Sequence, residues 1–150
     1  VRLEGGMVRL NAAVDDTMLM AAAEMAGLAR RLFDETLSYV KTREQFGQPI
    51  GRFQVIQHRM VDAYARCEEI QSALYRVLLI PARDRRAAIS GIKAQIAEAA
   101  IAVAEDAVQF HGGMGMTDEL IIGHGLKRIM LLAKLFGDPA TGLAAYAEAA

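Results

Sequence analysis

The sequence has one cysteine, three prolines and no tryptophan, and its formal net charge is only −1. Because a single cysteine cannot form an internal disulfide, Cys67 excludes a disulfide-stabilised scaffold and suits a reducing compartment, which we expect to be the cytoplasm. The near-zero charge excludes a nucleic-acid-binding or polybasic membrane-binding protein, so any anion site must be local. No apolar run reaches the roughly 18 residues of a membrane span, and no signal peptide is recognisable.

The remaining composition is that of one folded domain. Hydrophobic residues make up 53% of the 150 residues and charged residues 23%, which is typical of a globular chain with a sizeable core. Residues 1–13 show no helical period, and glycines interrupt them. We expect them to be a linker or strand remnant from an upstream domain, followed by a helical domain over residues 14–150. The sequence is therefore interpreted as a piece of a longer protein.

Apolar residues at three- and four-residue spacing predict four long helices. Their expected ranges are 16–41, 54–79, 85–110 and 119–136. Short connections between successive helices favour an all-α fold, an antiparallel four-helix bundle with a short terminal helix. We expect Asp15, Asp16 and Thr17 to cap the first helix, Thr117 the fourth, and Asp138, which precedes a proline, the terminal one.

The connection between the first two predicted helices is rich in side chains that can bind an anion. Closely spaced glycine and proline end a helix there, and arginine offers phosphate a planar fork of donors. One interpretation is a site for the pyrophosphate of a dinucleotide. Arg43 would pair with the phosphate, Phe46 would lie against a ring, and Gln54 would hydrogen-bond the ligand. The other interpretation, a solvated basic helix end, stays open from the residues alone.

A glycine-rich turn follows the third predicted helix. It contains Gln109, Phe110, His111, Gly112 and Gly113. Glycines let a backbone approach a ligand closely or adopt positive φ, but a tight interhelical turn is the simpler interpretation. Because the turn follows a helix, it is neither a Rossmann fingerprint nor a P-loop. In an antiparallel bundle, it should lie at the same end as the cationic connection.

Two motifs resemble the C-terminal domain of acyl-CoA dehydrogenases. They are TREQFGQPIGRFQ, residues 42–54, and AVQFHGGMGMTDE, residues 107–119. Both lie in the family's order and at about its separation, and the resemblance covers nearly the whole chain. It implies that Arg43 and Gln54 contact FAD held mainly by the neighbouring subunit. It also implies that the Gln-x-x-Gly-Gly turn contacts the adenosine diphosphate half of that FAD across a dimer.

The resemblance implies a flavoprotein oxidoreductase of fatty acid metabolism that performs α,β-dehydrogenation of an acyl-CoA thioester. It further implies an electron-transfer flavoprotein or similar electron acceptor, and a dimer of dimers, which we expect to be a homotetramer. The fragment alone should be inactive, because it lacks the family's other two domains. No metal is expected, since no histidine has metal-site spacing from other ligands.

The family's usual catalytic base has no counterpart here. By resemblance, Gly137 stands in place of the glutamate of a Tyr-Glu-Gly-Thr motif, and Thr17 lies near a second family location. The candidate substitutes are Glu24, Asp138 and Asp16. A base from a partner chain is another possibility. Two alternatives are a catalytically silent, flavin-binding or structural subunit of a hetero-oligomer and a helical module used only for association.

Overall fold

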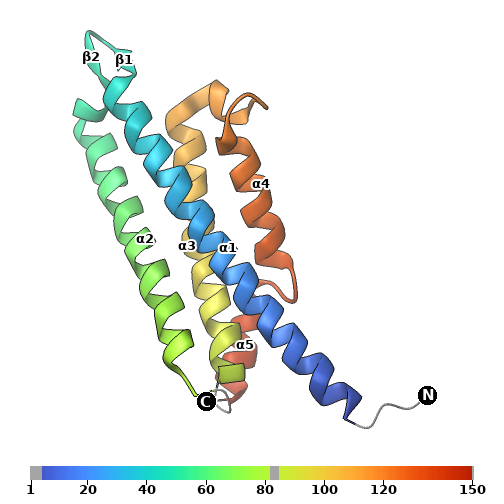
Figure 1. Cartoon of the computed structure of the whole chain (residues 1–150). Coiled ribbons are helices and arrows are strands. Elements are labelled where there is room, and N and C mark those ends of the chain that lie inside the picture. Colours follow the sequence, from blue (N-terminus) through green and yellow to red (C-terminus); the bar gives the residue numbers. More distant parts are fainter. Residues whose placement is uncertain (1–4, 82–84, 150) are drawn as a thin grey trace.

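The computed structural model describes residues 5–81 and 85–149, and within them the fold is a bundle of helices. The helices are α1 (Gly6–Thr42), α2 (Gln54–Leu79), α3 (Arg85–His111), α4 (Ile121–Lys134) and α5 (Pro139–Ala149). The shorter elements are β1 (Glu44–Gln45), β2 (Gln48–Pro49), η1 (Ile50–Arg52) and η3 (Gly112–Met116). The predicted all-α bundle is confirmed, with the long helices side by side and α5 at the far end (Figure 1).

Helix α3 is the centre of the bundle and packs against α1, α2, α4 and α5. Its buried face is built mainly from small residues. Four alanines on it are at most 1% exposed: Ala97, Ala100, Ala104 and Ala107. Alanine favours the helix and lets neighbouring helices approach closely. The cost of a larger residue at such contacts is visible on α4, where a Cβ at Gly125 would lie 2.8 Å from the buried Leu32 side chain of α1.

The predicted boundaries of α2 are confirmed, but α1 begins ten residues before the predicted start. The expectation that residues 1–13 form no helix is wrong for Gly6–Ala13, and residues 1–4 lie outside the described residues. These first turns project beyond the other helices in Figure 1, and Met7 and Val8 are 69% and 73% exposed. A helix without a buried face leaves no apolar stripe in the sequence. Its role as a linker stays a prediction.

Two predicted helix caps are wrong. Asp15, Asp16 and Thr17 lie inside α1, and the Thr17 hydroxyl donates to the Ala13 carbonyl oxygen at 2.7 Å. Thr117 does not cap α4, because that helix begins after Leu120 and the Thr117 hydroxyl donates back to Met114. In both cases the side chain satisfies a nearby carbonyl and not a helix N–H group.

The predicted cap of the terminal helix is confirmed. The backbone N–H of Thr141 donates to Oδ1 of Asp138 at 2.9 Å, and the Thr141 hydroxyl donates to the same oxygen at 2.8 Å. Pro139 is the first residue of α5, where its missing N–H group costs nothing.

Candidate functional site

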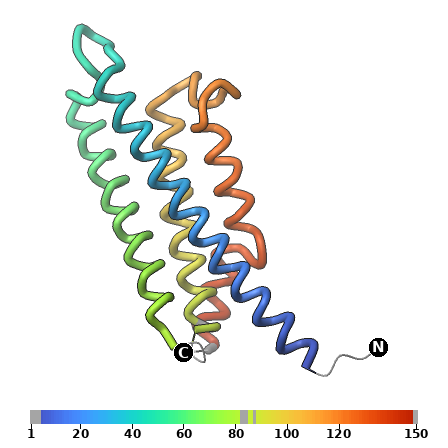
Figure 2. Tube along the Cα trace, viewed as in Figure 1, coloured from blue at the N-terminus to red at the C-terminus, as the bar shows by residue number. Residues whose placement is uncertain are grey.

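The connection between α1 and α2 is a small β-hairpin that stands out at one end of the bundle (Figure 2). Strands β1 and β2 pair in antiparallel register, and Phe46 and Gly47 form the two-residue turn with φ of 54° and 78°. Positive φ at both positions is typical of the type I′ turns that join such strands. The hairpin holds the Phe46 ring in solvent, 93% exposed, with its edge toward Phe53.

The glycine turn lies at the same end of the bundle as the hairpin. The imidazole of His111 stacks on the ring of Tyr39 from α1, with centroids 4.1 Å apart. The guanidinium of Arg59 from α2 lies 4.9 Å from the Phe110 ring centroid and pairs with Asp106. These contacts tie the end of α3 to both helices that flank the hairpin. The sequence-based expectation that the two turns lie at the same end of the bundle is therefore confirmed.

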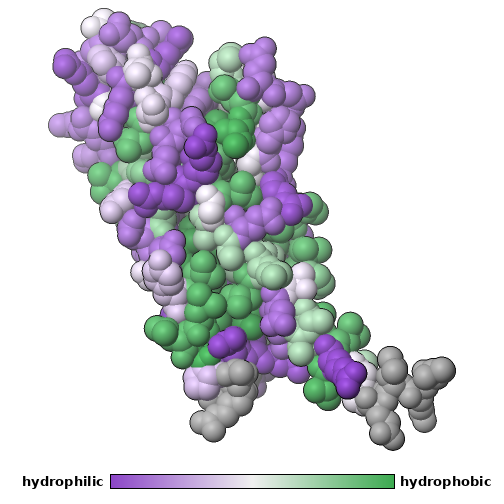
Figure 3. Space-filling view, in the orientation of Figure 1, coloured by the Kyte–Doolittle hydropathy of each residue, from purple (hydrophilic) through white to green (hydrophobic). Residues whose placement is uncertain are grey.

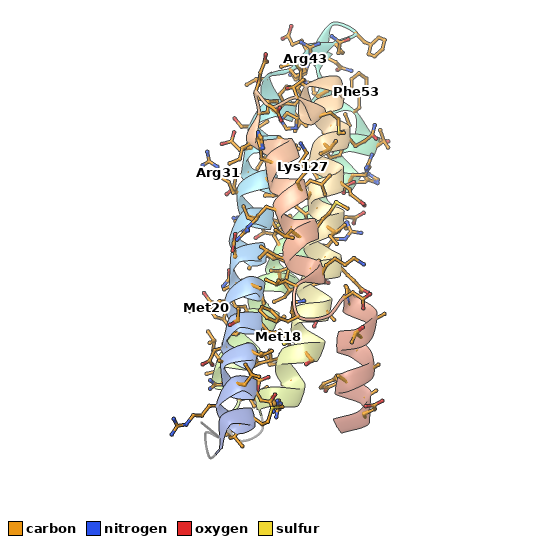
Figure 4. All side chains as sticks on the ribbon, turned by 90° about the vertical axis from the view of Figure 1, so that its right-hand side faces the viewer. Met18, Met20, Arg31, Arg43, Phe53 and Lys127 are labelled. Atoms are coloured by element: carbon orange, nitrogen blue, oxygen red, sulfur yellow. The ribbon has the colours of Figure 1, made fainter. Side chains whose placement is uncertain are left out.

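Most of the predicted flavin contacts are accessible at this end. The exposed residues are Arg43, Phe46, Gln54, Gln109, Gly112 and Gly113, while Phe110 is half-buried. Figure 4 shows Arg43 beside the hairpin, and Figure 3 shows a mainly hydrophilic surface there. The exception is His111, which is only 7% exposed and whose Nδ1 lies 2.8 Å from the Ala107 oxygen. Its ring is already engaged by Ala107 and Tyr39, so it has a structural role at this end.

The glycines of this end divide into two kinds, which sequence reasoning did not separate. No atom lies within 4 Å of a Cβ built at Gly112 or Gly113, so their backbone is open to a ligand. A Cβ at Gly115 would lie 2.9 Å from the Val108 oxygen, and one at Gly123 would lie 2.9 Å from the Gly115 oxygen. The latter pair is needed for close packing of η3 between α3 and α4.

Gly137, which by resemblance stands at the place of the family's usual base, lies near the other end of the bundle, in the turn between α4 and α5. Gly137 has φ of 109° and, with Met18 of α1, lines a cavity of about 100 Å³. In Figure 4, Met18 lies toward the opposite end from Arg43. Thr17, the other position that the resemblance suggests for a base, precedes Met18 in α1, but it is exposed and is not among the residues that line the cavity.

Two of the three candidate carboxylates, Glu24 and Asp138, are already engaged by other groups. Glu24 receives two hydrogen bonds from Arg128, at 2.6 and 2.9 Å, and these lower the pKa of the Glu24 carboxyl. The pKa of Asp138 is lowered by hydrogen bonds from the backbone and side chain of Thr141. A lowered pKa makes a carboxylate a weaker base. Asp138 lines the cavity, whereas Asp16 and Glu24 are not among its lining residues.

Sequence reasoning missed a buried lysine at this cavity. Lys93 of α3 is 3% exposed, and its Nζ donates to the carbonyl oxygens of Ala133 at 3.1 Å and Gly137 at 2.8 Å. Burial lowers the pKa of its ammonium group, and the Asp138 carboxylate opposes that change. A signal was present, because Lys93 falls four residues after Ile89 and three before Ile96, on the apolar stripe of α3.

The other titratable groups give no second site. Burial raises the pKa of the Cys67 thiol to about 11, which suits a core residue and not a nucleophile. In the described part of the chain, no group of three or more His, Cys, Asp or Glu residues could hold a metal ion. No helix in these described residues is both long and apolar enough to span a membrane.

Comparison with known proteins agrees with this geometry. The family described as "Acyl-CoA dehydrogenase, C-terminal domain" matches residues 4–148. The acyl-CoA dehydrogenase IpdE2 of Mycolicibacterium smegmatis is 39% identical over 125 residues, which are 83% of this chain and 39% of that protein. The chain thus spans about two-fifths of the length of this relative.

Solved structures lead to the same family. An acyl-CoA dehydrogenase from Geobacillus kaustophilus superposes with a TM-score of 0.87 and 25% identity, covering 98% of this chain and 39% of that one. The FAD complex of PigA superposes with a TM-score of 0.78 and 30% identity, covering 90% of this chain and 37% of that one. This chain belongs to the acyl-CoA dehydrogenase family and forms its C-terminal helical domain.

Proposed function

We propose that this domain belongs to an FAD-dependent oxidoreductase that dehydrogenates an acyl-CoA thioester, and that its hairpin end completes the FAD site of a partner subunit. The observation that carries the proposal is that two exposed turns lie at the same end of the bundle, where α3 is joined to both helices that flank the hairpin. One turn supplies a guanidinium and amide groups, and the other supplies open glycine backbone. This donor set suits a pyrophosphate.

Each residue has a specific part in this proposal. Arg43 binds a phosphate, Gln54 and Gln109 donate hydrogen bonds, and Phe46 offers a flat apolar face. No carboxylate among the described residues forms an ion pair with Arg43, so its guanidinium is available to an anion. The flavin, when bound, would accept the β-hydride of the acyl group.

The spacing along α1 supports a site shared between subunits. Arg43 and Met18 are 25 positions apart, which corresponds to roughly 37 Å at the rise of an α-helix. One extended dinucleotide would not span both the hairpin end and the Gly137 cavity. We infer that the domain serves two different active sites, so a dimer is the smallest complete unit and a dimer of dimers the expected assembly.

The contacts of this domain do not favour any of its own carboxylates as the base that takes the α-proton. A side chain at residue 137 would require φ near 109°, which residues other than glycine rarely adopt. Asp138 lines the cavity but is engaged as a cap, and Glu24 is paired with Arg128. These contacts favour the second candidate function, a catalytically silent, flavin-binding or structural subunit of a hetero-oligomer, or else a base supplied by a partner chain. The third candidate is a module used only for association.

Further parts of the proposal concern the surroundings of the enzyme. An electron-transfer flavoprotein or a similar protein would accept the electrons, and the single buried cysteine suits the reducing cytoplasm. Room beside Gly137 would favour acyl groups that are bulky near the reacting carbons.

The test uses the full-length protein and a matched pair of arginine variants. Arg43→Ala should lower FAD occupancy, whereas Arg31→Ala, in the middle of the exposed face of α1, should leave it unchanged. Equal occupancy in both variants would contradict the flavin site. Bleaching of the flavin by acyl-CoA then distinguishes an active subunit from a silent one. Activity lost in Glu24→Gln or Asp138→Asn would locate the base, and activity that survives both would point to another domain or chain.

A further inference from the structure

Lys93 is a charged side chain at a place where the fold has no evident use for charge. It lies on the buried face of α3 with 3% of its surface exposed, between Ile89 and Ile96. Burying an ammonium group costs free energy unless hydrogen bonds compensate for it. The depressed pKa of Lys93 reflects that burial. An apolar residue would fill the same space without this cost, so the hydrogen bonds of Nζ must explain the lysine.

Those hydrogen bonds go to the turn between α4 and α5. The Ala133 oxygen, 3.1 Å from Nζ, belongs to the last turn of α4, where carbonyl groups lack helical partners. The Gly137 oxygen, 2.8 Å from Nζ, lies three residues after the end of that helix. One ammonium group therefore joins the end of α4 and the following turn to α3.

The turn that Lys93 holds has an unusual backbone. Phe136 and Gly137 have consecutive positive φ values, 58° and 109°. The first is uncommon for a residue with a side chain, and the second is a conformation that glycine adopts readily and other residues rarely do. Space is not the obstacle, because a Cβ at Gly137 would meet only Cγ2 and Cβ of Thr141, at the ordinary contact distances of 3.6 and 3.8 Å. The backbone conformation, and not crowding, excludes a side chain at position 137.

We propose that Lys93 is a positioning residue that locks the α4–α5 turn in the conformation open only to glycine at 137. At position 137, backbone and not a side chain then borders the cavity that Met18 and Asp138 also line. The restraint of the turn follows from the hydrogen bonds of Nζ. Its effect on catalysis rests on the proposed function, since the cavity is where the reacting end of an acyl group would lie. A glutamate placed at 137 would act as a base only after the turn had been released.

Hydrogen exchange in the full-length protein tests the lock without requiring activity. The amide of Gly137 in the turn donates to the Lys134 oxygen, and the amide of Gly142 in the first turn of α5 donates to the Asp138 oxygen. Lys93→Met keeps the chain length and removes the donors, so amides of residues 134–142 should exchange at least about tenfold faster. Lys134→Met, which removes an exposed lysine at the same turn, is the matched control and should change exchange less than about twofold.

A double-mutant cycle shows whether Lys93 enforces the glycine conformation. Gly137→Ala should speed exchange of the turn about tenfold when Lys93 is present, and less than about threefold in Lys93→Met, because the released turn can relax. Unchanged exchange in Lys93→Met, or two effects that simply multiply, would overturn the proposal. If Lys93→Met does not fold, Lys93→Gln takes its place in the same cycle, with the same coupling expected and the same result contradicting it.

The flavin readout separates the lock from the proposed function. Lys93→Met should retain FAD occupancy while raising the KM for acyl-CoA about tenfold, because the turn borders the acyl cavity and lies far from the hairpin. Equal losses of occupancy and activity would indicate general unfolding and contradict a positioning role. No bleaching by acyl-CoA in the parent protein would contradict the proposed function alone, since the exchange result would still stand.

Discussion

A single methyl group at Gly123 should disturb the glycine turn through direct contact. Its Cβ would lie 2.9 Å from the Gly115 carbonyl oxygen and 3.7 Å from that of Thr117. Backbone atoms cannot turn aside as a side chain can, so α4 or η3 must shift, at a cost of about 1–3 kcal/mol. The gain in helix propensity from glycine to alanine offsets up to about 1 kcal/mol of this. We therefore expect a net destabilisation of about 0–2 kcal/mol.

Gly27→Ala is the matched control for the same change of residue. Gly27 is an exposed glycine inside α1, and no atom lies within 4 Å of its Cβ position. It should gain about 0.5–1 kcal/mol from helix propensity alone. The steric cost then separates the two variants by about 1–3 kcal/mol, and 1 kcal/mol corresponds to about 2–4 °C in the melting temperature of a domain this size.

The assay is thermal unfolding of the full-length protein, followed by circular dichroism and by release of flavin fluorescence. Gly123→Ala should melt several degrees below Gly27→Ala and should release flavin earlier. A Gly123→Ala protein that is as stable as Gly27→Ala would refute the close packing of η3 on α4. If the two variants are equally stable but Gly123→Ala releases flavin earlier, the packing argument is still refuted, and the turn contributes to flavin binding without contributing to stability.

Three further predictions follow from single residues. Phe46→Asn should keep or increase the stability of the hairpin, because asparagine tolerates the positive φ of this position. The same change should weaken FAD binding in a flavin titration, and unchanged binding would exclude a contact between the ring and the flavin. Cys67 should react with iodoacetamide only on unfolding, since a pKa of about 11 leaves about one thiolate in a thousand at pH 8, and rapid labelling by mass spectrometry would contradict this. Asp138→Ala should lower the melting temperature at neutral pH; because the folded pKa of Asp138 lies below its ordinary 3.8, the difference should be full above that value and should shrink as pH falls through the folded pKa.

The sequence predicted those elements whose pattern is set by burial. Helix α2 begins and ends where its stripe predicts, and α3 extends one residue beyond the prediction, because buried residues recur along most of the length of each helix. The first turns of α1 were missed because they pack against little in this domain. The start of α1 was predicted wrongly because Asp15 and Thr17 are residue types that often cap a helix. A helix that has already begun can continue through such residues.

The sequence predicted less of the candidate sites. The position of the two turns at one end followed from antiparallel topology, and the cap at Asp138 followed from its position before a proline. The hairpin could not be predicted, because its strands have two residues each and its turn places Phe46, not glycine, at positive φ. The position of Lys93 on the apolar stripe of α3 indicated that it is buried, but its partners could not be predicted, because they are backbone carbonyls 40 and 44 residues away.

The central claim is that the hairpin end of this domain completes an FAD site in a partner subunit. A structure of the full-length protein with FAD bound tests it most directly. The account predicts the Arg43 guanidinium and the Gln109–Gly113 turn within hydrogen-bonding distance of the pyrophosphate and adenosine of a flavin held mainly by another chain. A flavin that contacts neither turn, or one whose binding is complete within a single chain, would contradict it.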